Sequence, residues 1–283
     1  MSRILPKKRL GQVFLKNKIF LAEIIKAGEI SNKDTILEIG PGTGILTEAL
    51  LKTGAKIIAI EKDSQLVIFL KEKFKNDKNL TIIEADIRDF LKNPSFHTKY
   101  QIQDTKYKIV GNIPYYLTSY LFRLFLELEK KPEIIVLMIQ KEVAQRIIAQ
   151  PPQMSLLAVS IQFYAQPEII ALVPKTAFKP QPKVDSAIIK LIPYSHPVIA
   201  RPARGGASDE ALPAGRQESH FFKIVKAGFS HPRKLLISNL SQNLKIPKNQ
   251  LQEIFSKIAL PFNIRAQNLS LEDWTNLIQH LFA

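Results

Sequence analysis

A short polar segment that follows an apolar run carries the residues best suited to chemistry in this chain. Residues 111–115 read Gly-Asn-Ile-Pro-Tyr, and the largely apolar run before them, Tyr-Lys-Ile-Val at 107–110, is typical of a buried strand. Asn112 therefore stands at the carboxyl end of a predicted strand. Its amide oxygen and the Ile113 carbonyl can accept the two N–H bonds of an exocyclic amine. Pro114 stiffens the backbone and Tyr115 offers a ring for stacking, so the segment suits the amino group of a planar base.

A glycine-rich turn lies upstream, after the apolar run 36–39. Residues 40–44 read Gly-Pro-Gly-Thr-Gly. Glycines such as Gly40 and Gly42 let a backbone turn tightly and approach a ligand at the end of a strand. The spacing differs from the Gly-x-Gly-x-x-Gly of dinucleotide-binding proteins, and taken alone the segment reads equally well as a simple turn.

Acidic residues end the next two apolar runs. Glu61 is placed to accept both hydroxyls of a ribose, and Asp86 is placed to hold an adenine amino group. Because the carboxyl ends of parallel strands meet at one edge of a sheet, Glu61, Asp86 and Asn112 are expected around one crevice. The chain has no Gly-Lys-Ser/Thr phosphate-binding sequence, which favours S-adenosylmethionine over ATP or NAD. The five histidines are scattered along the chain and cysteine is absent, so no metal site is expected.

The composition indicates a polyanionic partner. The 283 residues carry a formal net charge of +15, which favours nucleic acid. Cysteine is absent, which excludes disulfides and thiolate metal sites and fits a reducing cytoplasm. No apolar run reaches the length of a membrane span and the basic start lacks a signal-peptide core, so a cytoplasmic protein is expected. With the amine pocket and the glycine turn, these features predict methylation of adenine N6 in nucleic acid.

Alternating strand and helix signals predict an α/β fold, with a parallel sheet covered by helices on both faces. Strands are expected at 35–39, 56–60, 80–84, 107–110, 133–139, 168–173 and 183–192, and helices at 46–51, 65–74 and 117–128. Helical spacing alone continues at 221–244, 248–258 and 271–282. The expected organisation is a catalytic domain over 1–194 that begins with a basic segment (1–20), a flexible insertion or linker over 195–219 and a helical domain over 220–283.

Six motifs follow one another along the chain. They are Lys-Arg-Leu-Gly-Gln-Val-Phe-Leu at 8–15, Glu-Ile-Gly-Pro-Gly-Thr-Gly at 38–44, Gly-Asn-Ile-Pro-Tyr-Tyr at 111–116, Gln-Lys-Glu-Val-Ala at 140–144, Phe-Lys-Pro-Gln-Pro-Lys-Val-Asp-Ser-Ala at 178–187 and Arg-Ala-Gln-Asn-Leu-Ser at 265–270. In this order the chain resembles the ribosomal RNA adenine N6-dimethyltransferases, specifically the small-subunit branch linked to kasugamycin sensitivity. The resemblance implies a Rossmann-like class I S-adenosylmethionine-dependent methyltransferase sheet with a small C-terminal all-helical domain.

The resemblance also implies residue roles and a substrate. S-adenosylmethionine is held by Val13, Leu15, Gly40, Glu61, Asp86 and Asn112, beside Gly42 of the turn. The target adenine is gripped by residues 112–115, with Phe178 as a second stacking face. The implied reaction is N6,N6-dimethylation of two adjacent adenosines in the 3′-terminal hairpin loop of small-subunit (16S) ribosomal RNA, late in 30S subunit biogenesis. The partner is then that RNA or the immature 30S subunit, and a monomer is expected.

Three departures and several alternatives remain at this point. Val13 stands where the family usually has a polar residue, so no side-chain hydrogen bond to the cofactor is expected there. The segment 150–156 is short and lacks the tyrosine-glycine pair common in the family, which affects the expected shape of one substrate-side loop. The insertion also has no family counterpart. A large-subunit (23S) enzyme of the macrolide-resistance type shares most motifs, and an assembly factor with secondary methylation would share the RNA-binding features. A DNA adenine methyltransferase shares the Asn-x-Pro-Tyr pocket, but no target-recognition domain is apparent.

Individual residues also have alternative interpretations. Tyr115 and Tyr116 are alternatively core aromatics. Phe178, in a proline-bounded loop, is expected outside the core. A set of basic side chains is expected to contact phosphates, with a solvated basic face as the alternative. These are Arg3, Lys7, Lys8, Arg9, Arg233 and Lys234.

Overall fold

The computed structural model describes residues 12–93, 95, 100, 106–126, 128, 130–195 and 214–282. The chain forms two compact units, which are considered separately. The sheet unit contains residues 1–145 and 166–193, and the helical unit contains residues 146–165 and 194–283. No helix within the described residues is long and apolar enough to cross a membrane. The phosphate contacts expected at Arg3, Lys7, Lys8 and Arg9 fall outside the described residues.

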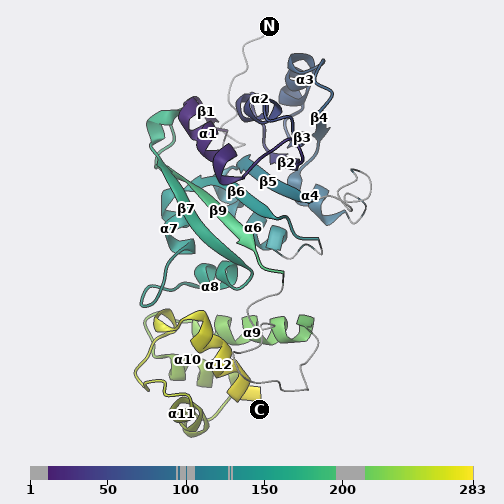
Figure 1. The fold of residues 1–283 in the computed structure, drawn as a ribbon. Coiled ribbons are helices and arrows are strands. Elements are labelled where there is room, and N and C mark those ends of the chain that lie inside the picture. Colours follow the sequence, from purple (N-terminus) through teal and green to yellow (C-terminus); the bar gives the residue numbers. More distant parts are fainter. Residues whose placement is uncertain are drawn as a thin grey trace. The chain divides into compact units, whose positions relative to one another are not determined.

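The sheet unit is built around a seven-stranded sheet in the order β4-β3-β2-β5-β6-β9-β7 (Figure 1). The strands are β2 (Thr35–Ile39), β3 (Lys56–Glu61), β4 (Leu80–Glu84), β5 (Tyr107–Asn112), β6 (Ile134–Gln140), β7 (Ala165–Val173) and β9 (Ser186–Pro193). Strands β2 to β6 pair in parallel, and β9 runs antiparallel to β6. The strand order reverses between β2 and β5, and the carboxyl ends at such a switch point form the ligand crevice of open α/β sheets.

These strands are rich in Ile, Leu and Val because both faces of the sheet are covered. All five residues of β2 are buried, as are the last five of β3. On one face, alternate residues such as Ile36, Ile57 and Val110 pack with α1 (Lys18–Ala27) and α2 (Ile45–Leu51). Figure 1 shows α6 (Thr118–Leu126) on the opposite face. The expected sheet with helices on both faces is confirmed.

Shorter elements complete the sheet unit. They are α3 (Ser64–Lys73), α4 (Ile87–Lys92), the 3₁₀ turns η2 (Tyr115–Leu117) and η3 (Lys175–Ala177), and α7 (Lys141–Ile147), whose last two residues belong to the helical unit. Strand β1 (Phe14–Leu15) pairs antiparallel with β8 (Phe178–Lys179). This pair joins segments more than 160 residues apart, so local sequence patterns did not indicate it.

The helical unit consists of α8 (Leu156–Gln162), α9 (Ala214–Gly228), α10 (Leu236–Leu244), α11 (Lys248–Lys257), the 3₁₀ turn η5 (Ala266–Asn268) and α12 (Leu271–Phe282). Its core holds the fully buried Trp274 and the stacked rings of Phe163 and Phe221, 4.3 Å apart. Gly228 packs so tightly on Trp274 that a Cβ there would lie 2.4 Å from the indole. The absence of a side chain at Gly228 therefore allows α9 to pack closely against α12.

The element limits differ from the expectations at several points. The strands at 35–39 and 80–84 have the expected limits, and the others shift by one to three residues. The single helical stretch expected at 221–244 is two helices, because Pro232 lies between them and lacks the N–H that a helix needs. Helix α9 begins at Ala214, inside the expected insertion, and 196–213 fall outside the described residues. The domain limits therefore stay a prediction.

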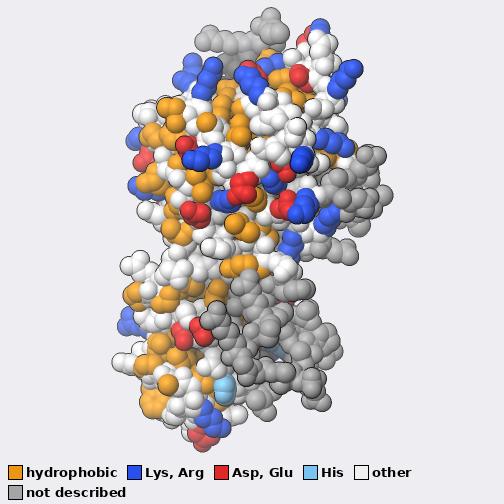
Figure 2. All heavy atoms as spheres, in the orientation of Figure 1, with side chains coloured by type: hydrophobic (Ala, Val, Ile, Leu, Met, Phe, Trp, Pro, Cys, Tyr) orange, Lys and Arg blue, Asp and Glu red, His pale blue; other side chains and the backbone are white. Residues whose placement is uncertain are grey.

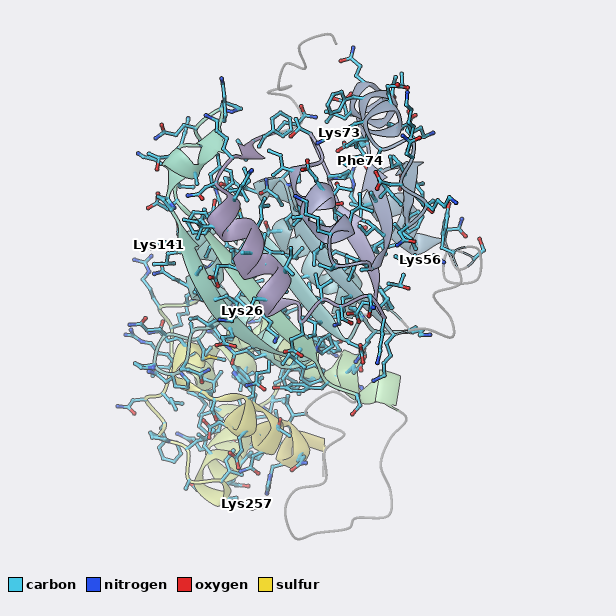
Figure 3. The ribbon with its side chains drawn as sticks, turned by 45° about the horizontal axis from the view of Figure 1, so that its top comes forward. Lys26, Lys56, Lys73, Phe74, Lys141 and Lys257 are labelled. Atoms are coloured by element: carbon cyan, nitrogen blue, oxygen red, sulfur yellow. The ribbon has the colours of Figure 1, made fainter. Side chains whose placement is uncertain are left out.

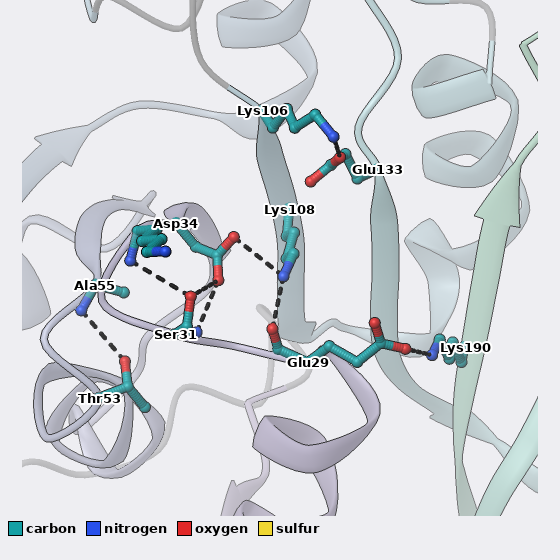
Figure 4. A network of polar contacts seen from close by, with 10 residues as sticks. Glu29, Ser31, Asp34, Thr53, Ala55, Lys106, Lys108, Glu133 and Lys190 are labelled. Atoms are coloured by element: carbon teal, nitrogen blue, oxygen red, sulfur yellow. Dashed lines mark hydrogen bonds and ion pairs between the residues drawn. The ribbon is translucent and has the colours of Figure 1, made fainter.

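A buried ion pair anchors the sheet edge opposite the carboxyl ends. Lys108, whose side chain is 8% exposed, donates to Asp34 Oδ1 at 3.0 Å and to the Glu29 carbonyl at 2.7 Å (Figure 4). Glu29 in turn binds Lys190 at 2.6 Å. These contacts connect β5, β9 and the loop before β2.

Replacing Asp34 by alanine is expected to lower the free energy of unfolding by about 3–5 kcal/mol, because the buried Lys108 ammonium loses its counter-charge. The matched control is Glu133→Ala, which removes the partner of the exposed Lys106 in the same region and should cost about 1 kcal/mol or less (Figure 4). Urea unfolding of both variants measures the difference. Equal losses would contradict the assignment of Lys108 as a charge that needs Asp34.

Candidate functional site

A pocket opens where β2, β3, β4 and β5 end, at the switch point of the sheet. It is lined by most of the residues predicted for the cofactor and the amine. These are Val13, Leu15, Gly40, Gly42, Glu61, Asp86, Asn112, Ile113 and Pro114. Tyr115 and Phe178 are not part of this lining. The single crevice expected from the strand-end residues is thus present.

The glycine turn adopts a backbone that other residues rarely accept. Gly42 has a φ of +60° and Gly44 a φ of +77°. A Cβ on Gly44 would lie 2.6 Å from the Phe74 ring, and Lys73 beside it donates to the Thr43 carbonyl at 3.3 Å. Figure 3 shows Lys73 and Phe74 together at the end of α3. Residues at the end of helix α3 therefore pack against the glycine turn and bind its backbone. The segment 40–44 is thus more than a simple unconstrained turn.

Glu61 ties the glycine turn to the end of β3. Its carboxylate accepts from the backbone N–H of Gly42 at 3.2 Å, of Lys62 at 2.8 Å and of Asp63 at 2.9 Å. Burial raises the pKa of Glu61, and these three donors act in the opposite direction. Oε1 takes two of the donors and Oε2 takes one. Oε2 therefore keeps the greater capacity to accept from a ligand hydroxyl in the pocket.

Asp86 follows β4 and caps α4, where it accepts from the Arg88 backbone N–H at 3.0 Å. Its carboxylate also binds the Arg88 guanidinium and the Lys62 ammonium. The hydrogen bonds from Arg88 and Lys62 hold the pKa of Asp86 well below its usual range. Asp86 is therefore an ionised acceptor at the far end of the pocket from Asn112.

The Asn112 amide has a fixed orientation. Its Nδ2 donates to the Val13 carbonyl at 2.9 Å. Its Oδ1 is buried, and no described residue donates to it. A buried acceptor without a donor is costly unless a ligand supplies one. Val13 thus contributes its backbone to the site, although its side chain offers no hydrogen bond.

Tyr115 is half-buried and held by its hydroxyl. The hydroxyl lies 2.8 Å from Ser186 Oγ, and Ser186 is fully buried at the start of β9. The Tyr115 carbonyl accepts from Thr118 Oγ1 at 2.9 Å, which closes the turn η2 onto α6. The ring is thus neither free nor a full core residue. The Tyr116 side chain lies outside the described residues.

The expectation that Phe178 lies outside the core is wrong. Phe178 is 3% exposed and packs in the cluster that contains Leu15, Leu21 and Ile24. The reason is the pairing of β1 with β8, which places Phe178 opposite Leu15. Proline residues around the loop indicated exposure, but a long-range strand pair decided its position.

Glu38 is a buried carboxyl directly before the glycine turn. It is 1% exposed, and no described residue gives either oxygen a hydrogen bond of normal geometry. Burial raises the pKa of Glu38 from 4.5 to about 8, with Thr47 acting against the shift and Glu61 adding to it. Glu38 is therefore protonated in the folded protein at neutral pH.

This protonation predicts a pH dependence of stability. Between the unfolded and folded pKa values the folded chain binds the extra proton, so the free energy of unfolding falls as pH rises, by about 1.4 kcal/mol per pH unit. Glu38→Gln keeps the shape and removes the titration. Urea unfolding from about pH 5 to about pH 8 should show a downward slope in the wild type that is shallower in the variant. The same slope in both proteins would contradict the assignment.

Several residues of the site escaped the sequence analysis. Gln12 donates to Asp63 at 3.1 Å and so fastens the N-terminal segment over the pocket. Lys62 and Arg88 bind Asp86, and Ser186 holds Tyr115. Asp63 before Ser64 is a helix N-cap pattern that could have been found. The Arg88 contact is also local, because Arg88 lies two residues after Asp86, whereas the contacts of Gln12, Lys62 and Ser186 are tertiary and carry no local signal.

The lining fits S-adenosylmethionine without further assumptions. Two carboxylates line the pocket: Glu61, which is buried, and Asp86, which is partly exposed. Glu61 is the group expected to meet ribose hydroxyls, and Asp86 is the group expected to meet the adenine amine. Apolar side chains such as Ile60, Leu66 and Ile87 lie between them. The unpartnered Asn112 Oδ1 remains for a second ligand.

Known proteins match both the sequence and the fold. The family described as ribosomal RNA adenine dimethylase matches residues 5–204. A ribosomal RNA small subunit methyltransferase A from Dehalococcoides mccartyi is 40% identical over 272 residues, which cover 96% of this chain and 87% of the relative.

Two solved structures share the architecture. A dimethyladenosine transferase from Plasmodium falciparum has a TM-score of 0.74 and 25% identity, covering 95% of this chain and 97% of that one. The 23S rRNA methyltransferase ErmE has a TM-score of 0.72 and 25% identity, covering 95% of this chain and all of the other. The predicted class I methyltransferase fold and the predicted class of S-adenosylmethionine-dependent enzyme are confirmed. The chain belongs to the ribosomal RNA adenine dimethylase family.

Proposed function

We propose that this protein dimethylates the N6 amines of two adjacent adenosines in the 3′-terminal hairpin loop of 16S ribosomal RNA, acting as a cytoplasmic monomer on the immature 30S subunit. The observation that carries the proposal is the Asn112 amide. Its nitrogen is engaged by the Val13 carbonyl, which leaves its buried oxygen as an acceptor beside the cofactor pocket. An adenine N6 amine supplies the missing donor.

Asn112 would act on the reactivity of the amine. The adenine amine is a weak nucleophile because its lone pair is delocalised into the ring. Acceptance of its N–H bonds by Asn112 Oδ1 and the Ile113 carbonyl favours a pyramidal nitrogen whose lone pair can attack. S-adenosylmethionine supplies the electrophilic methyl group on its sulfonium. No side-chain base is needed, since the proton released from the product ammonium can pass to water.

Cofactor binding is assigned to the residues that surround the pocket. Glu61 would accept the ribose hydroxyls, Asp86 the adenine amine, and the turn at Gly40 and Gly42 would allow close backbone approach. Val13 and Leu15 close the pocket from the N-terminal segment, which Gln12 fastens to α3.

Two aromatic residues would hold the target base. Tyr115 would stack on it, contributing about 1–3 kcal/mol, with its ring direction set by Ser186. The Phe178 ring, assigned as the second face, must leave its packing against Leu15 to reach a base. Opening of the β1–β8 pair is the movement that would release it.

The small-subunit assignment rests on the relatives. A protein 40% identical across nearly the whole chain is called a small subunit methyltransferase, whereas the 23S enzyme ErmE shares the fold at 25% identity. A large-subunit substrate is the less supported alternative. A role purely in assembly has no specific support, since the pocket keeps its acceptor residues.

Basic side chains in the helical unit are proposed to contact RNA phosphates. Arg233 and Lys234 are exposed and line a groove together with Lys248 and Arg265. Figure 2 shows Lys and Arg side chains spread over the visible face of the sheet unit as well.

Replacing both Arg233 and Lys234 by alanine should weaken binding to 30S subunits and lower the salt slope of that binding by about one unit per lost phosphate contact. The matched control replaces Lys226 and Lys257, two exposed lysines outside the groove (Figure 3 labels Lys257). An unchanged salt slope in the groove variant would remove the groove from the interface.

The proposed reaction is tested by methyl transfer from labelled S-adenosylmethionine to undermethylated 30S subunits, followed by nucleoside mass spectrometry. N6,N6-dimethyladenosine should form in small-subunit RNA and be absent from 50S subunits and DNA offered in parallel. Methylation of large-subunit RNA instead would favour the 23S alternative. Tight 30S binding without methyl transfer would favour the assembly role.

A further inference from the structure

The Asp86 carboxylate already has a full set of donors. Oδ1 accepts from the Arg88 backbone N–H and from Arg88 Nε, both at 3.0 Å. Oδ2 accepts from Arg88 Nη2 at 2.6 Å and from Lys62 Nζ at 2.8 Å. An ionised carboxylate offers about four lone-pair positions, so an arriving adenine amine must displace one of these donors.

The two cations differ in how firmly they hold Asp86. Arg88 makes three of the four bonds, from a planar guanidinium and from its own backbone, so losing one leaves two in place. Lys62 makes one bond, from a flexible side chain that is 53% exposed. Its ammonium regains water when it leaves. Lys62 is therefore the donor that an amine displaces.

We propose that Lys62 competes with the adenine 6-amino group for Asp86 and thereby sets how strongly this protein prefers a 6-amino over a 6-oxo purine in its cofactor pocket. The inference rests on the proposed placement of the adenine amine at Asp86. An amine binds Asp86 only after Lys62 has left.

A 6-oxo group reverses the role of Lys62. A carbonyl oxygen is an acceptor and gains nothing from the Asp86 carboxylate, but it can accept from an ammonium that stands at the same place. Lys62 thus weakens binding of the adenine compound and supports binding of its 6-oxo counterpart. Without Lys62, the carboxylate alone would meet the base, and the preference for the amine would increase.

Isothermal titration calorimetry with S-adenosylhomocysteine and its 6-oxo analogue S-inosylhomocysteine tests the proposal, independently of turnover. Lys62→Met keeps the side-chain length and removes the donor. It should bind S-adenosylhomocysteine about two- to fivefold more tightly and the inosyl analogue more weakly by a similar factor. Lys56→Met is the matched control: Lys56 is an exposed lysine at the start of β3, whereas Lys62 directly follows the end of that strand (Figure 3). It should leave both affinities unchanged.

Asp86→Asn separates this inference from the placement on which it rests. Asn keeps the helix cap and removes the charge. If it weakens S-adenosylhomocysteine binding while Lys62→Met changes neither affinity, the competition by Lys62 is refuted and the placement stands. If Asp86→Asn changes neither affinity, the adenine amine does not bind Asp86, and both the placement and the inference are overturned. Weaker binding of S-adenosylhomocysteine to Lys62→Met would also refute the proposal, because the predicted change in affinity is in the opposite direction.

Discussion

Replacing Asn112 by alanine is expected to slow methyl transfer by about 10³-fold while weakening cofactor binding only moderately. The Asn112 amide oxygen accepts an N–H bond of the amine as the nitrogen lone pair becomes available for attack. Removing this oxygen therefore raises the free energy of the transition state. The moderate loss of cofactor affinity follows from the missing bond to the Val13 carbonyl, which helps to hold the N-terminal segment over the pocket. Single-turnover rates on undermethylated 30S subunits and calorimetry with S-adenosylhomocysteine measure the two effects separately.

The control for Asn112 is Asn79→Ala. Asn79 is an exposed asparagine before β4 whose amide donates to the Gly54 carbonyl, away from the pocket. Its loss should leave rate and affinity unchanged. A nearly normal rate for Asn112→Ala would remove the amide from the mechanism. A fall in affinity as large as the fall in rate would make Asn112 a cofactor-binding residue only.

Replacing Glu61 by alanine is expected to weaken S-adenosylhomocysteine binding by about 10²-fold or more, because hydrogen bonds to a charged acceptor contribute about 1.5–3 kcal/mol each. The change also leaves the Gly42, Lys62 and Asp63 N–H groups without their common acceptor. Calorimetry with S-adenosylhomocysteine and with an analogue lacking both ribose hydroxyls measures the effect as a thermodynamic cycle. The Glu61→Ala variant should bind the two ligands with nearly equal affinity.

Glu84→Ala is the matched control for Glu61. Glu84 lies directly beside Glu61 in the register of β3 and β4, but its side chain is exposed. Cofactor affinity should be unchanged in this variant. If Glu61→Ala still discriminates between the ligands as the wild type does, the ribose does not bind Glu61.

The strands and their end residues were accessible from sequence because their signals are local. The strands at 35–39 and 80–84 are short runs rich in Ile and Leu, and the carboxyl ends of parallel strands meet at a common edge of the sheet. Gly40, Glu61, Asp86 and Asn112 stand at or just after the ends of four such runs, 35–39, 56–60, 80–84 and 107–110, and were therefore predicted to meet. The pocket lining brings them together.

Long-range contacts explain what the sequence did not indicate. The buried position of Phe178 depends on pairing with Leu15, and the orientation of Asn112 depends on the Val13 carbonyl. Of the two cations on Asp86, Lys62 follows β3 and is distant from Asp86 in the chain, whereas Arg88 lies in α4 only two residues from Asp86. No periodicity encodes the contacts of Phe178, Asn112 and Lys62, because each joins segments that are separated in the chain and that only folding brings together.

The most direct test of the central claim is the position of the modification in cells. A bacterium lacking its own small-subunit adenine dimethyltransferase is complemented with this protein or with the Asn112→Ala variant, and the 3′-terminal fragment of 16S RNA is analysed by mass spectrometry. The wild type should restore N6,N6-dimethyladenosine at two adjacent positions of the hairpin loop, and the variant, present at equal abundance, should not. Unmodified adenosines with the wild type, or full modification with the variant, would contradict the account.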